Sequence, residues 1–373
     1  MRRLVYLCDW LPPDFGAVGQ YAVLSCRDRA AQGYEVTLVG LTSGPTRLEE
    51  ERIGQGLLRI LRLAAPPLDR ANLARRLVWT ARTNMALIRA AWTYLKASDQ
   101  ILFTGSPPFL LHYLVPLNLL LRKDLIYRIA DFHPECLIAS RDKPSTALNA
   151  FLKLTIWLRR RVQRFEASGE DQRRLLQSYG IPSGNIVLKR DPPPVELTGA
   201  EQPLPLPGEL AGKVVLLYSG NWGVAHDTDT FINAYIRHHR QGSGRVGLWL
   251  NAIGVGATIV EERLKAEGLP VVRGRPVPFG DLGRLLVTPD THLITLRDGF
   301  VAYVIPSKTY GCIASGKAVL YIGSDASDVD LICREGAQPG QIYIRVPVGD
   351  VDGVSKALEM LADAVRDGSD QRL

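Results

Sequence analysis

The stretch VIPSKTYGCIASGKAVLYIG, residues 304–323, predicts a loop, a short helix and a buried strand in immediate succession. It carries two lysines where a core element of a folded domain should have none. Lys308 stands at the predicted start of the helix, where free N–H groups favour an anion, so a lysine there completes a phosphate site. Lys317 follows Gly316 at the end of the helix, where a cation complements the helix dipole. We therefore predict a ligand-binding role for Lys308 and a structural role for Lys317.

The same strand and helix pattern extends outward over both halves of the chain. In the second half, the predicted strands are KVVLLYSG, VGLWLNAIG, LPVVRG, THLITL, KAVLYIG and IYIRVP, and VSKALEMLADAVRD predicts a closing helix. In the first half, RLVYLCDW and YEVTLVGL flank a helical stretch that ends at Gly33, and the later strands are QILFTG, LIYRIAD, the end of RVQRFEAS, and NIVLKR. Strands that alternate with helices predict an α/β protein with parallel, doubly wound sheets.

The length of the chain and one proline-rich segment predict two domains. At 373 residues, the chain is long enough for two domains that each bury a core. Residues 191–211, DPPPVELTGAEQPLPLPGELA, lack periodicity and are typical of an inter-domain connection. We therefore predict a first domain at 1–190, a linker at 191–211 and a second domain at 212–373. Because open parallel sheets bind ligands beyond the carboxyl ends of their strands, two such domains facing each other across a cleft would suit a two-part ligand.

Composition narrows the class of protein and its partners. With 46% hydrophobic and 22% charged residues, the chain has a globular composition. Its first apolar run, before Asp9, is too short for a signal sequence, and the run at 109–121 is shorter than the ~20 residues of a membrane span. The net charge of +7 indicates an anionic partner, which phosphate ligands, lipid surfaces and nucleic acids all satisfy. The basic residues are not interleaved with aromatic ones in a single patch, which disfavours nucleic acid.

No metal site or disulfide framework is predicted. The five cysteines are scattered and never adopt a CxxC spacing, which fits a reducing cytoplasm. The carboxylates of DTD, residues 227–229, directly precede or open a predicted helix, so we assign them to helix capping rather than to a metal. The sequence holds no other cluster with metal-ligand spacing.

Two glycine-containing loops, one in each half, follow predicted strands and precede predicted helices. Gly16 and Gly19 lie in WLPPDFGAVGQYA, and Gly220, Asn221 and Gly223 lie in YSGNWGVAHDTDTF. Small residues at such positions let backbone N–H groups approach an anion at the start of a helix. A tight turn that needs glycine for its geometry alone is the alternative for each loop.

Five motifs together resemble a known family. PPDFGAVGQYA, TGSPPFLL at 104–111, DFHPECLIAS at 131–140, YSGNWGVAHDTDTF and PSKTYGCIASGKAVL occur in the order and spacing of the glycosyltransferase family 4 group. The resemblance covers nearly the whole chain and looks closest to the bacterial members with a "PSK" signature, which build lipopolysaccharide, capsule or exopolysaccharide. It implies a GT-B fold of two Rossmann-like domains, with the acceptor mainly on the first and the nucleotide sugar mainly on the second.

The resemblance also implies the chemistry. The family transfers a sugar from a nucleotide diphosphate with retention of anomeric configuration and requires neither a divalent metal nor another cofactor. The leaving diphosphate itself is thought to take the acceptor proton. The enzyme then holds two substrates in line and stabilises the developing phosphate charge with fixed donors. A chain with glycine loops and a lysine, but without a carboxylate pair of the glycosidase kind, suits this chemistry.

Motif by motif, the resemblance assigns roles to residues of this chain. It implies catalytic roles for Lys308, His133 and Asp131. For donor binding it implies Lys308 together with Gly16, Gly19, Gly220, Asn221, Gly223, His226 and Ser307.

The chain departs from the family pattern at several positions. It lacks the usual basic pair after the second glycine loop, which leaves His226 and Lys308 as candidates. The family usually has two glutamates, one for hydroxyls of the donor sugar and one for the nucleotide ribose, where this chain has Tyr303 and Gly311. The family's histidine before Asp131 is replaced by Ala130, although His133 lies close by in the sequence. These departures motivate an alternative, a degenerate subunit that binds a partner glycosyltransferase. A non-hydrolysing sugar-nucleotide epimerase, which has the same two-domain fold, is the second alternative.

The segment ALNAFLKLTIWLRRRVQRF, residues 147–165, predicts an amphipathic helix. Its predicted apolar face comprises Leu148, Phe151, Leu158, Val162 and Phe165. Nearly opposite lies a stripe of Lys153, Trp157, Arg160 and Arg164. A basic stripe with a tryptophan suits the headgroup region of an anionic membrane, and an ordinary solvated face is the alternative. A lipid-linked or saccharide acceptor at the inner face of the plasma membrane would fit the first interpretation.

Overall fold

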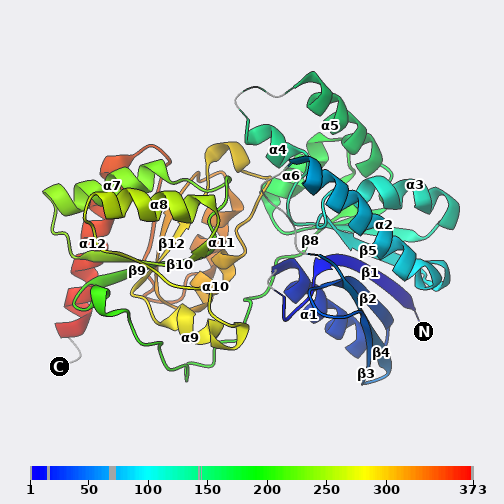
Figure 1. The fold of residues 1–373 in the computed structure, drawn as a ribbon, viewed down its shortest axis with the longest axis horizontal. Coiled ribbons are helices and arrows are strands. Elements are labelled where there is room, and N and C mark those ends of the chain that lie inside the picture. Colours follow the sequence, from blue (N-terminus) through cyan, green and yellow to red (C-terminus); the bar gives the residue numbers. More distant parts are fainter. Residues whose placement is uncertain (1, 15–16, 67–72, 142, 144, 371–373) are drawn as a thin grey trace. The chain divides into compact units, whose positions relative to one another are not determined.

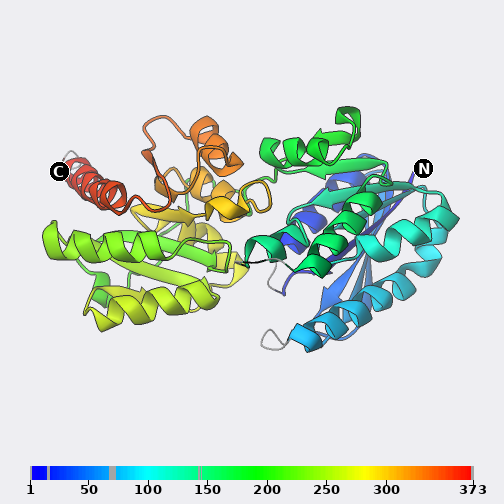
Figure 2. The same ribbon diagram turned by 90° about the horizontal axis from the view of Figure 1, so that it is seen from above.

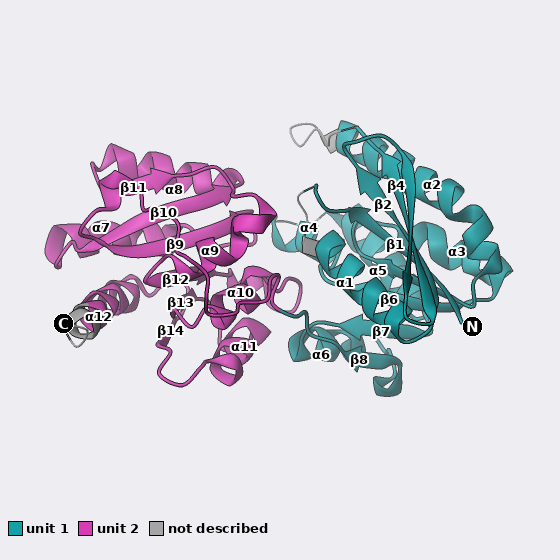
Figure 3. Cartoon of the chain, turned by 90° about the horizontal axis from the view of Figure 1, so that it is seen from below, with its two compact units in different colours: residues 1–192 teal, residues 193–373 magenta. Residues whose placement is uncertain are grey.

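The computed structural model describes residues 2–14, 17–66, 73–141, 143 and 145–370. The chain divides into two compact units, residues 1–192 and 193–373 (Figure 3). Each unit is built around one twisted sheet that is covered by helices (Figure 1). Most of the segment predicted to be a linker belongs to the second unit, where Leu210 is fully buried and Leu204 packs against buried core residues.

The first unit is an α/β unit whose strands follow the predicted order. In its described residues the strands are β1 (Arg3–Trp10), β2 (Glu35–Thr42), β3 (Arg47–Ile53), β4 (Gly56–Ala64), β5 (Gln100–Thr104), β6 (Asp124–Ile129), β7 (Arg164–Ala167) and β8 (Ile186–Leu188). The helices are α1 (Ala17–Ala31), α2 (Leu73–Ala97), α3 (Leu111–Leu121), α4 (Glu135–Ala139), α5 (Thr146–Arg159) and α6 (Glu170–Ser178). Helices α2, α3 and α5 pack side by side over one face of the sheet (Figure 2), and α1 packs on the other.

One edge of the first sheet departs from the predicted parallel arrangement. The strand order is β3-β4-β2-β1-β5-β6-β7-β8, and β3 pairs antiparallel with β4 while the other pairs are parallel. This hairpin was not predicted, because RLEEERI in β3 is almost entirely charged and carries no hydrophobic alternation. Charged side chains on an edge strand are a common protection against pairing with another chain.

The second unit contains a six-stranded parallel sheet. In its described residues the strands are β9 (Val214–Asn221), β10 (Val246–Ile253), β11 (Val271–Arg273), β12 (Thr291–Thr295), β13 (Ala318–Ile322) and β14 (Tyr343–Val346), in the order β11-β10-β9-β12-β13-β14. The helices are α7 (Asp229–Gln241), α8 (Val255–Ala266), α9 (Leu282–Val287), α10 (Lys308–Ala314), α11 (Asp328–Gly336) and α12 (Val351–Asp370). Each strand predicted from the second half of the sequence is therefore confirmed.

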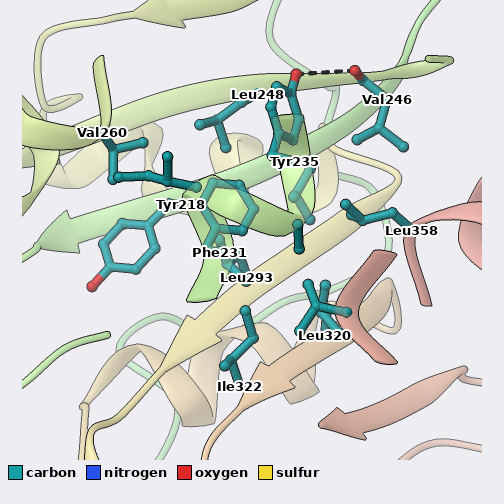
Figure 4. Packing of buried hydrophobic residues seen from close by; sticks show 14 of the residues in the cluster. Tyr218, Phe231, Tyr235, Val246, Leu248, Val260, Leu293, Leu320, Ile322 and Leu358 are labelled. Atoms are coloured by element: carbon teal, nitrogen blue, oxygen red, sulfur yellow. Dashed lines mark hydrogen bonds between the residues drawn. The ribbon is translucent and has the colours of Figure 1, made fainter. Parts of the chain in front are cut away.

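The core of the second unit lies between this sheet and the helices α7, α8 and α12. Buried aromatic side chains from α7, including Phe231 and Tyr235, pack onto Leu248 and Leu293 of the strands (Figure 4). The Tyr235 hydroxyl donates a hydrogen bond of 3.0 Å to the carbonyl of Val246, so the one polar atom of this ring is satisfied inside the core.

The prediction of one helix through residue 165 is wrong. Helix α5 ends at Arg159, and Phe165 lies in β7, where it pairs in register with Tyr127 of β6. Arg164 also lies in β7 and forms an ion pair with Asp124, so it is not part of a helical stripe. In β7 the Phe165 ring is completely buried.

The end of α5 is held by a fully buried ion pair. The Arg159 guanidinium pairs with the Glu135 carboxylate at the start of α4, and both side chains are almost inaccessible to solvent. A second nitrogen of Arg159 donates 3.1 Å to the carbonyl of His133, and the guanidinium lies over the Phe132 ring. The pair therefore ties α5 to the loop that carries Asp131 and His133.

We expect the Arg159→Ala substitution to lower the free energy of unfolding by about 3–5 kcal/mol, because it leaves the Glu135 carboxylate buried without its partner. The matched control is Arg164→Ala, whose ion pair with Asp124 is largely exposed and which should change stability by only about 0–1 kcal/mol. Urea unfolding of the full chain measures both. Equal effects of the two substitutions would contradict the structural role of the buried pair.

Candidate functional site

The candidate site of the second unit lies where the chain changes direction in the sheet. Strands β9 and β12 are neighbours in the sheet. The chain continues from β9 to β10 on one side of this pair and from β12 to β13 on the other side. Such a topological switch point leaves a crevice at the carboxyl ends of the two strands, where α/β proteins bind ligands. The loops that follow β9 and β12 meet there, because the Arg297 amide donates 2.9 Å to the Ala225 carbonyl.

Lys308 is the first residue of α10, and its ammonium group is buried at this switch point. Nζ lies 3.0 Å from the centroid of the Tyr218 ring, and Tyr218 is itself stacked on Trp222 at 3.7 Å. Within the described residues, Nζ has no hydrogen-bond partner. Burial lowers the pKa of Lys308 well below its usual value, and the nearby Cys312 thiol opposes this shift. A buried amine without an anion is suited to receive an anionic ligand.

His226 lies beside this lysine in the loop after β9. Its Nδ1 lies 2.5 Å from the Thr295 carbonyl at the end of β12, and because a carbonyl only accepts, Nδ1 carries the proton. Burial and then the charge of Lys308 lower the pKa of His226 to about 3. The imidazole is therefore neutral at physiological pH, and its Nε2 is an acceptor.

The glycine loop of the second unit has one position that requires glycine. Gly220 adopts a φ of +97°, which side chains of L residues rarely tolerate, whereas Gly223 has no such φ and lies against the Asn221 side chain. Asn221 itself is exposed at the end of β9. Ser307 occupies the N-cap position of α10, and its hydroxyl makes no capping bond.

The carboxylate at position 227 follows the predicted capping role. Asp227 accepts hydrogen bonds from the Thr230 hydroxyl at 3.0 Å and from the Phe231 amide at 3.3 Å, in the first turn of α7. Among the residues that the structure describes, no group of three or more His, Cys, Asp or Glu side chains is placed to hold a metal ion.

Gly311 is a close-packing position on α10. A Cβ atom there would lie 3.2 Å from Cδ1 of Leu286 on α9 and 3.4 Å from Cδ of Pro194. The helix therefore approaches apolar neighbours at the position where the family resemblance expects a carboxylate. A glutamate would have to displace these side chains or bury its charge against them.

We expect Gly311→Glu to destabilise the protein by at least about 2 kcal/mol, because a charged side chain would enter an apolar contact. Gly280→Glu is the matched control, since Gly280 is exposed and nothing lies near its missing Cβ. Thermal unfolding of both variants tests this expectation. Unchanged stability of Gly311→Glu together with tighter nucleotide-sugar binding would contradict it.

The first unit has a second group of polar residues at its own switch point, between β1 and β5. Asp9 lies near the carboxyl end of β1 and accepts a hydrogen bond of 2.5 Å from the Ser106 hydroxyl, which follows β5. Its other oxygen, Oδ1, is buried and has no partner among the described residues. Burial raises the pKa of Asp9 to about 6. The sequence analysis missed this residue, although its position at the end of the first strand could have indicated it.

Asp131 and His133 follow β6, next to β5 in the same sheet. Asp131 is exposed to solvent along part of its surface. Desolvation by the surrounding protein nevertheless raises the pKa of its carboxyl, and the charge of His133 partly offsets this rise. Burial lowers the pKa of His133. The charges of Arg159 and Arg76 lower this pKa further, whereas the carboxylates of Asp131 and Glu135 raise it. The Phe109 and His133 rings are arranged edge to face, with their centroids 6.5 Å apart.

Phe109, in the loop after β5, adopts a φ of +69°, which is strained for a bulky side chain. Its ring packs edge-on against the stacked rings of His112 and Phe151, with centroid distances of 5.7 and 5.3 Å. Local backbone strain of this kind is frequent at ligand-binding sites.

The first glycine loop differs from the second. A Cβ atom at Gly19 would lie 1.9 Å from the carbonyl oxygen of Trp10, so close packing of α1 on β1 explains this glycine without a ligand. Gly16 lies outside the described residues. Apart from Gly19, the predicted site residues that the structure describes thus form two groups, one near the switch point of each unit.

Comparisons with known proteins rest on structure. No protein-family model matches the sequence, and no curated protein matches it. Among solved structures, Anabaena HepE in complex with UDP and glucose is similar with a TM-score of 0.62 at 12% identity, over 96% of this chain and 89% of that chain. WaaG, a glycosyltransferase involved in lipopolysaccharide biosynthesis, is similar with a TM-score of 0.60 at 11% identity, over 96% and 90%.

An α,α-trehalose-phosphate synthase (UDP-forming) from Burkholderia vietnamiensis is similar with a TM-score of 0.58 at 11% identity, over 98% of this chain and 91% of that chain. These similarities extend over both units of the chain. The chain therefore has the GT-B fold that these glycosyltransferases share.

Proposed function

We propose that this protein is a retaining glycosyltransferase of the family 4 type. It transfers a hexose or N-acetylhexosamine from a nucleotide-diphosphate sugar to a lipid-linked or saccharide acceptor in cell-surface polysaccharide biosynthesis. The observation that carries the proposal is Nζ of Lys308, which is buried at the switch point of the second unit and has no hydrogen-bond partner in the part of the chain that the structure describes. Solved structures of this fold hold UDP and glucose or UDP-glucose, which makes a UDP-sugar the first donor to test.

In this proposal the second unit holds the diphosphate. Lys308 supplies the positive charge, and Ser307 and the backbone near Gly220 supply neutral donors to the phosphate oxygens. These groups are already in place, so they stabilise the charge that develops on the leaving diphosphate without reorganisation. Neutral His226 accepts a hydrogen bond from a sugar hydroxyl at its Nε2. No metal ion or other cofactor has a role in this scheme.

The first unit holds the acceptor. Asp131 and His133 orient the acceptor hydroxyl, and Asp9 adds a carboxylate whose Oδ1 has no hydrogen-bond partner among the described residues. A hydroxyl donor from a bound saccharide would satisfy this oxygen. The leaving diphosphate takes the proton of the acceptor hydroxyl, so none of these side chains needs to act as a strong base.

The degenerate-subunit alternative has one specific observation in its favour. A Cβ atom at Gly311 would lie 3.2 Å from Leu286, so a ribose-binding carboxylate at this position would require its apolar neighbours to shift. A transferase would have to bind the ribose through other groups. Binding of a nucleotide sugar by the isolated chain distinguishes the two functions.

We expect one or more of the UDP-, GDP-, ADP- and TDP-sugars to bind the purified chain in calorimetry, and Lys308→Ala to weaken that binding roughly ten- to hundredfold. Lys317→Ala is the matched control, because this lysine lies at the other end of α10, and it should leave affinity within about twofold. Equal affinity of the wild type and Lys308→Ala would refute the phosphate assignment. No binding by any member of the panel would favour the degenerate subunit.

The same titrations have an expected pH dependence. Burial holds the pKa of free Lys308 well below its usual value, and a bound phosphate raises it. Binding of the nucleotide sugar therefore takes up a proton. The affinity for the nucleotide sugar falls as the pH rises from the pKa of Lys308 in the free protein toward the pKa of Lys308 in the complex. Titrations in buffers of different ionisation enthalpy measure this proton uptake.

We further propose that the chain works in the cytoplasm at the inner face of the plasma membrane. None of the described helices is long and apolar enough to cross a bilayer. The predicted basic stripe has fewer residues on α5 than expected. Arg164 lies in strand β7, and the Arg160 side chain donates a hydrogen bond of 2.7 Å to the Tyr179 carbonyl. Exposed Lys153 and Trp157 remain on α5.

The wider layer of α2, α3 and α5 supports a membrane contact more strongly. None of the three helices contains an Asp or a Glu. On α2, exposed basic residues recur every seven positions at Arg82, Arg89 and Lys96, beside an exposed row of Val78, Met85 and Trp92. Seven residues are about two helical turns, so both rows run along one side of the helix. Basic and apolar side chains without acids suit an anionic headgroup layer.

We expect the double substitution Arg89→Glu and Lys96→Glu to weaken binding to phosphatidylglycerol vesicles at least tenfold, since each basic residue near such a surface contributes about 1 kcal/mol. The control is Arg263→Glu with Lys265→Glu on α8, which changes the net charge equally and should leave vesicle binding within about twofold. Vesicle co-sedimentation compares the two. Equal losses would mean that only net charge matters and that α2 is an ordinary solvated helix.

A further inference from the structure

The proposed function leaves one cation at the switch point of the second unit without a role. Arg297 follows the end of β12 by two residues, and β12 is one of the two strands that flank this point. Its side chain is exposed, whereas Nζ of Lys308 at the same point is buried. An exposed cation beside a proposed phosphate site is a candidate for a second contact with the ligand.

The backbone of Arg297 is fixed on both sides. Its amide donates a hydrogen bond of 2.9 Å to the Ala225 carbonyl, and its carbonyl accepts one of 2.9 Å from the Phe300 amide. The Phe300 side chain is buried and anchors the turn Asp298–Phe300. A side chain on a fixed backbone loses less freedom when it binds a ligand, so this mount favours binding.

The guanidinium group of Arg297 lies at the loop that follows β9. Its Nη1 donates to the Val224 carbonyl at 3.4 Å, a long and therefore weak hydrogen bond. Among the residues that the structure describes, no carboxylate forms an ion pair with Arg297. A guanidinium group has five N–H donors, so most of them are available to a ligand.

The charge of a diphosphate calls for a cation in addition to Lys308. Each of its phosphoryl groups carries negative charge, and further charge develops on the leaving group when the sugar departs. The loop after β9 supplies no second cation of its own, because residues 221–227, NWGVAHD, contain neither lysine nor arginine. Arginine suits this task, since its planar fork binds two phosphate oxygens through parallel hydrogen bonds.

His226 connects the two cations. Its Nδ1 donates to the carbonyl of Thr295, two residues before Arg297. The residue before His226 is Ala225, whose carbonyl accepts the bond from the Arg297 amide. The charge of Lys308 also reaches this imidazole, because after burial it is the second cause of the low pKa of His226. Arg297 and Lys308 therefore border the same loop.

We propose that Arg297 is the second cation of this site and binds one phosphoryl group of the donor while Lys308 binds the other. The site consequently selects diphosphates over monophosphates. This inference rests on the proposed function and adds to it a binding residue and a basis for selectivity. Arg297 contributes from the loop after β12, and Lys308 contributes from the start of α10.

Calorimetry on the full chain with inorganic diphosphate and inorganic phosphate tests the proposal, because these probes carry no base or sugar. We expect the wild type to bind diphosphate at least tenfold more tightly than phosphate. Arg297→Ala should weaken diphosphate about tenfold and leave phosphate within about twofold, since Lys308 still holds a single phosphoryl group. Unchanged diphosphate affinity, or an equal loss for both anions, overturns the proposal.

Three variants separate ligand binding from a structural role. Arg297→Gln keeps a donor for the Val224 carbonyl but removes the charge, so it should lose as much diphosphate affinity as Arg297→Ala. Arg297→Lys keeps the charge and should stay within about threefold of the wild type. Arg240→Ala is the matched control, because Arg240 is exposed in the last turn of α7 and pairs with Glu267, and it should change affinity by less than about twofold.

Two of these results would contradict the assignment. Wild-type affinity of Arg297→Gln would mean that the residue only holds the loop. A loss in Arg240→Ala equal to that in Arg297→Ala would mean that only the net charge of the unit matters.

Lys308→Ala in the same titrations separates this inference from the proposed function. It should weaken both anions at least tenfold. If Lys308→Ala weakens diphosphate and Arg297→Ala does not, the role of Arg297 is wrong while the phosphate site of the transferase stands. If diphosphate does not bind the wild type, or if neither substitution changes its affinity, both assignments are wrong.

Discussion

The geometry of the parallel sheet is the constraint on which both candidate sites depend. In a doubly wound sheet all parallel strands end at the same edge, and the chain leaves two neighbouring strands in opposite directions at one place only. In the second unit this place lies between β9 and β12, and Lys308 is there. In the first unit it lies between β1 and β5, where Ser106 donates to Asp9. Residues far apart in sequence are therefore brought together by strand order alone.

The buried charges of the protein fall into two kinds. Arg159 is paired with Glu135, and Arg128 donates to Glu166 at 3.0 Å inside the first unit. These groups are compensated by the fold, and they hold helices and strands in place. Nζ of Lys308 and Oδ1 of Asp9 are buried without partners among the described residues. A fold retains such uncompensated groups at a cost in stability, and a ligand that supplied the missing partner would explain their presence.

The departures from the family pattern have a physical basis at one position. Gly311 is not an open site that has lost a side chain, because Leu286 and Pro194 occupy the space around it. The neighbours of α10 are arranged for a glycine, which means that a nucleotide would have to be held by other contacts. Lys308, one turn earlier on the same helix, keeps its aromatic support from Tyr218 and does not depend on this change.

The amino-acid sequence by itself determined the α/β class and the parallel strands, and it singled out Lys308 as a candidate ligand-binding residue. Hydrophobic runs bounded by glycine loops are local features, and strands of the second unit lie where these runs predicted them. The sequence did not reveal the β3–β4 hairpin, because β3 is charged and only its pairing with β4 makes it a strand. It also placed Phe165 and Arg164 on a helix, since their spacing fits either structure.

Only the tertiary structure decided which polar groups are compensated. Asp9 and Glu135 are both acids near the ends of strands or helices, and nothing in their local sequence distinguishes them. Arg159 reaches Glu135, whereas within the described residues Oδ1 of Asp9 has no partner. Burial and pairing depend on contacts between distant segments, and a sequence pattern reports only on neighbours along the chain.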